Sequence, residues 1–237
     1  MKRLDQWLSN LGYCSRREAR AWLRDGRLTR PHGEAWEDVG ARADAAEVRV
    51  DGEPLDHPEG LLVMMNKPAG VVCSHDTREG RRVYDLVPER WNRRIPPLAS
   101  IGRLDRDTTG LLLLTDQTAL VHQLTSPKHK VPKRYVAGFA QPVPVARQEE
   151  IAALFASGSV TLEGETEACL PAELHWRGPA EAEIVLVEGR FHQVKRMFAA
   201  VGAVVITLHR SNFGRLALPD DLPPSEFRLL AVDFSFF

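Results

Sequence analysis

The chain lacks long apolar stretches, and no hydrophobic run in its 237 residues approaches the roughly 20 residues that span a bilayer. We therefore expect no membrane contact, and because Met1 leads straight into a helical pattern we expect no signal peptide. Cysteine is also scarce. Cys14, Cys73 and Cys169 are too few and too far apart for a disulfide framework or a metal site, which favours reduced thiols and a cytoplasmic protein.

An excess of charge of one sign is missing as well. The net charge is −1, so no global basic signature points to nucleic acid. The near balance conceals a local asymmetry, since residues 1–30 hold eight Lys and Arg against three Asp and Glu, whereas residues 31–60 hold two against nine. A nucleic-acid partner must therefore be argued from local patches, of which the first lies at the N-terminus.

The basic N-terminal stretch has a helical pattern. Apolar spacing predicts a first helix over residues 3–11, and a capping box of Ser15 and Glu18 predicts a second over residues 16–25. Arginines fall on one side of this second helix, which suits a phosphate backbone. A solvated charged face is the alternative, although Glu18 is the one carboxylate among these arginines before the helix ends. The arginines are Arg16, Arg17, Arg20, Arg24 and, extrapolated past the end of the helix, Arg27.

The most distinctive stretch covers residues 101–115 and reads Ile-Gly-Arg-Leu-Asp-Arg-Asp-Thr-Thr-Gly-Leu-Leu-Leu-Leu-Thr. Its apolar end, Leu111–Leu114, predicts a strand buried on both faces. The polar loop before this strand holds two arginines and two aspartates, and loops between buried elements often carry function. Asp105 is the candidate functional carboxylate, with the capping of a turn beside Thr108 as the alternative role.

This loop resembles the signature loop of RNA pseudouridine synthases, and the resemblance extends over nearly the whole chain. In that family the Asp of Gly-Arg-Leu-Asp is the essential catalytic residue, which here is Asp105. Residues 133–136 resemble the second family motif, whose tyrosine lies under the target base and is here Tyr135. Residues 188–202, a predicted helix, resemble the third motif, whose basic residue pairs with the catalytic Asp and is here Lys195.

The resemblance also implies a set of substrate-binding residues. Leu208 matches an apolar residue that the family places against the flipped base, and Arg210 lies close by. Arg103 adjoins the catalytic carboxylate, where it could fill the space that the base leaves or hold a phosphate. His192 and Gln193 belong to the third motif, and helical spacing predicts that His192, Lys195 and Arg196 share one face. The set is Arg103, Leu208, Arg210, His192 and Gln193.

Residues 3–55 resemble an S4-type RNA-binding domain, which adds Arg3 to the predicted RNA contacts. The segment 30–33 departs from the family pattern because Pro31 cannot donate to a strand ladder. A polar linker over residues 57–60 predicts an S4-type domain over 1–58 and a catalytic domain over 59–237. Such a linker permits relative domain motion. The fold class is therefore α+β, with a mixed, mainly antiparallel sheet flanked by helices in the larger domain.

Several smaller features carry further predictions. Lys67 follows a predicted strand in an Asn-Lys-Pro turn, and we expect an exposed lysine there, with a contact to RNA as the alternative. An excess of arginine over residues 78–94 predicts an RNA-facing patch, with Trp91 packed in the core. Further helices are predicted over 117–124 and 146–156, and strands over 61–65, 159–166, 169–176, 182–187, 204–210 and the apolar tail 227–237.

The resemblance implies isomerisation of a uridine to pseudouridine in ribosomal RNA, as naked RNA or as a partly assembled ribonucleoprotein, by a monomer without metal or cofactor. The third motif is closest to the small-subunit (16S) branch, since large-subunit relatives usually carry Arg in place of Lys195. Asp105 would attack the ribose, attack the base or remove a ribose proton. Alternatives are a large-subunit (23S) target, a non-catalytic S4 assembly protein, or a glycosidase that uses Asp105 and Asp107.

Overall fold

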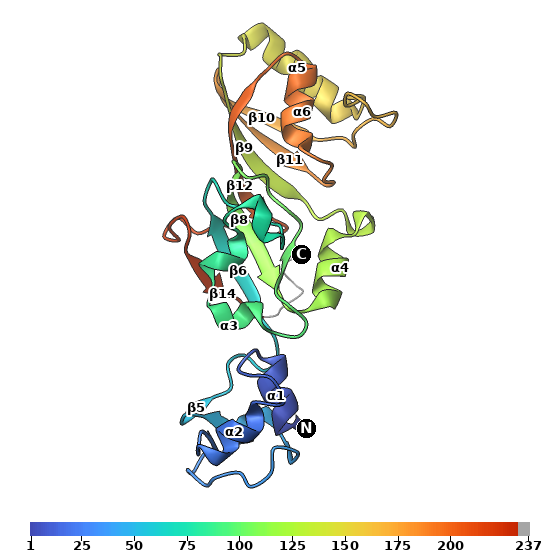
Figure 1. Ribbon diagram of the computed structural model, residues 1–237. Helices are drawn as coiled ribbons and strands as arrows, with labels where there is room; N and C mark the ends of the chain where they lie inside the picture. The colour runs from blue at the N-terminus through green and yellow to red at the C-terminus, as the bar shows by residue number, and fades with distance from the viewer. Residues whose placement is uncertain (232–237) are drawn as a thin grey trace.

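The computed structural model describes residues 1–231 and has an α+β architecture in two parts (Figure 1). The helices are α1 (Leu4–Asn10), α2 (Ala19–Arg24), α3 (Glu89–Asn92), α4 (Thr118–Thr125), α5 (Val145–Ser157) and α6 (Gln193–Ala200). The strands are β1 (Lys2–Arg3), β2 (Leu28–Thr29), β3 (Arg42–Ala43), β4 (Arg49–Val50), β5 (Glu53–Pro54), β6 (Leu62–Lys67), β7 (Ala99–Ile101), β8 (Thr109–Thr115), β9 (Lys133–Phe139), β10 (Glu173–Gly178), β11 (Glu181–Leu186), β12 (Val205–Phe213), β13 (Leu216–Ala217) and β14 (Phe227–Leu229).

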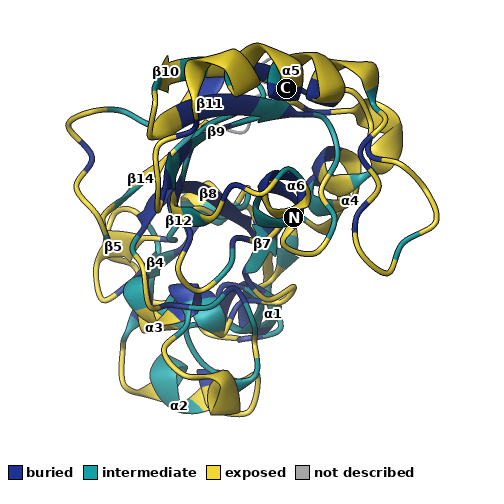
Figure 2. Cartoon of the chain, turned by 90° about the horizontal axis from the view of Figure 1, so that it is seen from above, coloured by how far each residue is buried: buried dark blue, intermediate teal, exposed yellow. Residues whose placement is uncertain are grey.

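One large sheet organises the C-terminal part. Its strands run in the order β10-β11-β9-β12-β8-β6-β14, with β13 on β12 and β7 on β8. All pairs are antiparallel except β8 with β12, which confirms the predicted mixed, mainly antiparallel sheet. Leu111–Leu114 in β8 are fully buried, as their continuous apolar run predicts, because both faces of this strand are covered (Figure 2).

The parallel pair β8–β12 depends on a glycine. Gly110 has a φ of +102°, and a Cβ atom placed on it would lie 2.3 Å from the carbonyl oxygen of Arg210. A side chain would therefore clash with the backbone of β12 and strain its own backbone. With glycine there, β12 lies directly beside the end of the loop 102–108 and brings Leu208 and Arg210 next to that loop.

The helices cover the sheet in two places. α4 contacts β7 and β8, whereas α5 contacts β10 and α6 contacts β12, and both lie at the end of the molecule far from the N-terminal part (Figure 1). Phe139, Phe155 and Phe198 join these two helices to the sheet through ring contacts of 4.8 and 5.2 Å between centroids. Within residues 1–231, no helix combines the length and the apolar character needed to cross a membrane.

The predicted helix over 188–202 and the predicted strand over 159–166 differ most from the structure. The helix expected over 188–202 begins only at Gln193, because His192 adopts a left-handed conformation with a φ of 50°. The strand expected over 159–166 is a turn around Gly164 with one isolated bridge between Thr161 and Ala168. The apolar tail does pair at the sheet edge through β14, and residues 232–237 of that prediction lie outside the described residues.

The N-terminal part has its own hydrophobic core, built from α1, α2 and the short strands β2 to β4, with Leu4, Leu8, Ala19 and Leu28 fully buried. Ser15 and Glu18 exchange the hydrogen bonds of the predicted capping box, but α2 begins only at Ala19. The domain boundary at residues 58 and 59 stays a prediction, and the separate core supports it.

The segment that joins the two parts is held by Arg94. This residue is only 2% exposed, its Nη2 donates to the carbonyl oxygens of Asp56 and His57 at 2.9 and 2.7 Å, and its Nε lies 3.1 Å from Oδ2 of Asp116. Arg94 therefore does not face RNA, contrary to the predicted patch. Its contacts oppose the free domain motion that the polar linker suggests. Trp91 packs in the core beside it, as predicted.

Replacement of Arg94 by Met should lower the free energy of unfolding by about 3–5 kcal/mol, because the carboxylate of Asp116 and two linker carbonyls lose their buried partner. Arg93 offers a matched control, since its side chain is 59% exposed and lies 3.7 Å from Glu89. Arg93→Met should cost less than about 1 kcal/mol. Urea unfolding measures both, and equal losses would contradict a structural role specific to Arg94.

Candidate active site

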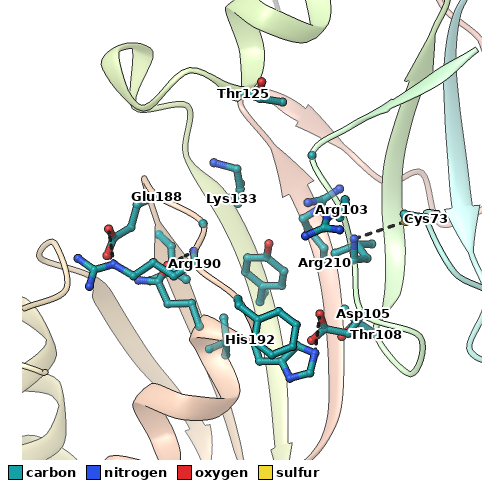
Figure 3. Close-up of a pocket in the computed structure, with 18 of the residues that line it drawn as sticks. Cys73, Arg103, Asp105, Thr108, Thr125, Lys133, Glu188, Arg190, His192 and Arg210 are labelled. Carbon is teal, nitrogen blue, oxygen red and sulfur yellow. Dashed lines mark hydrogen bonds and ion pairs between the residues drawn. The ribbon is translucent and has the colours of Figure 1, made fainter. Parts of the chain in front are cut away.

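A cavity of about 630 Å³ lies between the loop that carries Asp105 and the segment before α6 (Figure 3). Figure 3 shows Asp105 close to His192 at one end of the cavity, and Lys133 and Thr125 toward the other. The strands β9 and β12 supply its floor with side chains from neighbouring positions. The predicted residues that line it are Arg103, Asp105, Tyr135, His192, Gln193, Leu208 and Arg210.

Two basic side chains face the carboxylate of Asp105. Nε2 of His192 lies 3.4 Å from Oδ1, and Nζ of Lys195 lies 3.6 Å from Oδ2. The predicted pairing of Lys195 with Asp105 is thus present, but a shorter contact competes with it, because the same Nζ donates to Oδ1 of Asp107 at 2.6 Å. This hydrogen bond holds the pKa of Asp107 below its usual value. The ammonium group of Lys195 therefore interacts with the carboxylates of both Asp105 and Asp107.

The floor of the cavity comes from paired positions on β9 and β12. Tyr135 lies directly opposite Arg210 in the antiparallel register, and Leu208 lies opposite Ala137. Arg210 is 1% exposed and donates from Nε to the carbonyl oxygen of Leu111 at 2.7 Å. Within residues 1–231, its Nη2 is buried without a hydrogen-bond partner. This buried guanidinium beside an aromatic ring can receive an acceptor atom of a ligand.

Gln193 and Arg196 have structural partners. Gln193 donates from Nε2 to Glu188 at 2.5 Å and accepts from the Arg190 backbone N–H at 2.9 Å, so both ends of its amide hold the segment before α6. Arg196 binds Glu165 at 2.6 Å. The prediction that Arg196 shares a face with His192 and Lys195 is wrong, because His192 lies before the helix and Arg196 points to another loop.

Lys67 positions the loop that carries Asp105, and sequence reasoning misplaced it. It is fully buried rather than exposed, and Nζ donates to the carbonyl oxygens of Pro68, Asp105 and Thr108 at 3.1, 3.0 and 2.8 Å. Two of these carbonyls belong to the loop that carries the candidate carboxylate, so Lys67 fixes its backbone. The local sequence could not have found this role, because the two loop carbonyls that Lys67 binds lie 38 and 41 residues further along the chain.

The predicted RNA-binding arginines lie on the surface of the N-terminal part with unequal freedom. Four of them are exposed and make no side-chain hydrogen bond or ion pair within residues 1–231, namely Arg16, Arg17, Arg20 and Arg24. Arg3 is exposed as well, but it pairs with Asp5 at 2.9 Å. Arg27 binds Asp51 at 2.6 Å and lies over the ring of Trp22 at 3.6 Å. The four unpaired arginines are therefore the stronger candidates for phosphate contacts.

Comparisons with known proteins agree with this fold. Residues 61–200 match the family model described as RNA pseudouridylate synthase, and residues 2–29 match the S4 domain model. The chain belongs to the RNA pseudouridylate synthase family and carries an S4 domain at its N-terminal end.

Individual relatives match over most of their length. The chain is 38% identical over 237 residues to ribosomal small subunit pseudouridine synthase A of Vibrio cholerae, which covers 98% of this chain and 96% of the relative. It is 40% identical over 190 residues to the protein of the same name from Escherichia coli K12, covering 79% and 78%. A crystal structure of a pseudouridylate synthase superposes with a TM-score of 0.66 at 35% identity, covering 98% of this chain and 96% of that one.

Replacement of Lys67 by Met should lower the turnover of an RNA substrate by about 100-fold, because the loop that carries Asp105 loses the donor to two of its carbonyls and a shift of about 1 Å has that cost. Lys128→Met removes an exposed lysine and should leave turnover unchanged. Steady-state kinetics of both variants test this. Wild-type turnover by Lys67→Met would show that the loop holds itself.

Turnover should also fall as the pH rises through about 8. Burial lowers the pKa of Lys67 to about 8, so above this pH the amine loses a proton and one of its donated hydrogen bonds. Burial likewise lowers the pKa of Lys133 to about 8. A pH–rate profile of Lys133→Met separates the two, since the decline caused by Lys67 should persist in that variant. Its disappearance would assign the decline to Lys133.

Proposed function

We propose that this protein isomerises a uridine to pseudouridine in small-subunit (16S) ribosomal RNA, with Asp105 as the catalytic carboxylate. The position of Asp105 carries the proposal, because its carboxylate faces His192 and Lys195 at the end of a cavity floored by Tyr135 and Leu208. The names of the relatives from Vibrio cholerae and Escherichia coli support the small-subunit target. Within 16S rRNA, we propose that the uridine at position 516 is the one that is modified.

In this proposal a cation lies beside the reacting carboxylate. A nearby cation stabilises a carboxylate anion, and Nζ of Lys195 lies 3.6 Å from Oδ2 of Asp105. Nε2 of His192 approaches the same carboxylate at 3.4 Å. The target base leaves its stack, which costs a few kcal/mol, and the ring of Tyr135 with the side chain of Leu208 receives it. The isomerisation breaks one bond from base to ribose and forms another, so neither a redox cofactor nor a metal is required.

The remaining assignments follow from the same site. Arg103 is exposed beside Asp105 and has no hydrogen bond or ion pair within residues 1–231, which suits contact with RNA. Arg210 offers a buried donor to the bound nucleotide. His192 approaches the carboxylate, and Gln193 shapes the wall. The exposed arginines of the S4 domain hold the RNA backbone, and the enzyme acts as a monomer in the cytoplasm.

A glycosidase based on Asp105 and Asp107 is less well supported. Such an enzyme needs one carboxylic acid with a raised pKa to protonate the leaving group. The pKa of Asp107 is instead lowered, because Lys195 donates a hydrogen bond to it. A large-subunit target stays the alternative within the family, since it needs the same site.

Tritium release from RNA labelled at C5 of uridine tests the function directly, because isomerisation replaces the C5–H bond by a bond to ribose. We expect release from 16S rRNA or its partly assembled ribonucleoprotein, and none from 23S rRNA. Release from 23S rRNA alone would overturn the target. Binding without release from either RNA would favour a non-catalytic assembly protein.

The two loop aspartates provide a matched pair of variants. Asp105→Asn should abolish tritium release and leave RNA affinity within about threefold, because the amide keeps the shape but not the charge. Asp107→Asn should keep turnover within about tenfold, since Lys195 can then turn fully to Asp105. Tritium release by Asp105→Asn, or loss of tritium release in Asp107→Asn alone, would assign the catalytic role to Asp107.

A further inference from the structure

One exposed aromatic side chain at the cavity has no part in the reaction proposed above. Phe191 lines the cavity, and 69% of its surface is exposed. A single exposed apolar side chain is common on protein surfaces, so exposure alone does not indicate a function. The contacts of this ring, and the way its backbone is held, provide the argument.

The ring of Phe191 stacks on His192, which in turn lies beside the catalytic carboxylate. Its ring lies on the ring of His192, with 3.8 Å between centroids and 20° between planes. Nε2 of His192 in turn lies 3.4 Å from Oδ1 of Asp105. One face of Phe191 is therefore covered by His192, and its high exposure leaves the other face open to an additional planar group.

The backbone that carries this ring is anchored on both sides. Arg190 binds Glu165 at 2.7 Å and donates to the carbonyl oxygen of Ala168 at 2.6 Å, and Arg196 donates to the carbonyl oxygen of Phe191 itself at 3.1 Å. An aromatic ring held in place loses little conformational freedom when a partner stacks on it. The structure thus presents a preorganised flat apolar surface at the rim.

We propose that Phe191 is a stacking platform for the nucleobase that neighbours the target uridine in the RNA strand. The inference rests on the proposed function, since the target nucleotide must reach Asp105 and the strand on either side of it must cross the rim. Stacking accepts any base because every base has a π-face. The platform would hold the flanking strand while the target base is extruded, without reading its sequence.

The test crosses a change in the protein with a change in the RNA. The probe is a single-stranded RNA of about ten nucleotides with one uridine between adenosines, and matched RNAs carry an abasic residue on its 5′ or 3′ side. Phe191→Ala should weaken the Kd by roughly 5- to 150-fold, and Phe191→Trp should restore it. One of the two abasic RNAs should lose a similar factor with wild-type protein and nothing further with Phe191→Ala.

Ile206→Ala is the matched control, because Ile206 is an apolar side chain with 63% exposure that does not line the cavity. It should bind all the RNAs as the wild type does. If Phe191→Ala and each abasic RNA weaken the affinity independently, so that their factors multiply, the proposal is overturned. Phe191 would then only support His192. Unchanged affinity in Phe191→Ala would overturn it as well. Because Kd needs no turnover, a wild-type enzyme without tritium release would refute the proposed function and leave this test intact.

Discussion

The hydrogen bonds from the buried Lys67 ammonium to the main chain are the interaction on which the active-site geometry depends. A buried amine requires acceptors, and here the carbonyl oxygens of Pro68, Asp105 and Thr108 supply them. The loop that carries Asp105 is thereby tied to the end of β6, a buried strand that pairs with β8 and β14. The carboxylate of Asp105 is therefore held in place as firmly as a side chain on a strand, although it lies on a loop.

The sheet brings the rest of the cavity to this fixed loop. β8 leads out of the loop, and its parallel pairing with β12 places Leu208 and Arg210 alongside it. β9 pairs with the other edge of β12 and adds Tyr135. Gly110, which has no side chain, makes the pairing of β8 with β12 possible, since any Cβ atom there would clash with the backbone of Arg210. The site therefore consists of a loop, two strands and the segment before α6, all fastened to one sheet.

Much of this arrangement could be predicted from local pattern and from family resemblance. The buried strand Leu111–Leu114 follows from its composition, and the gathering of Asp105, Tyr135 and Lys195 follows from their motifs. Lys67 and Arg94 could not be placed in this way, because distant carbonyls and carboxylates bury them and such partners leave no periodic trace. Asp105 and Asp107 lie two residues apart in one loop. The sequence therefore could not show that Lys195 contacts both of their carboxylates.

Amide hydrogen exchange of the Asp105 loop tests the central role of Lys67 most directly. The backbone N–H of Thr108 donates to the carbonyl oxygen of Asp105 at 3.1 Å, within the turn that Lys67 holds. The account predicts that Lys67→Met makes this amide exchange much faster, whereas the amides of β8 keep their protection. Unchanged protection of Thr108 in a folded Lys67→Met variant would contradict the account, because the loop would then keep its shape without the buried ammonium.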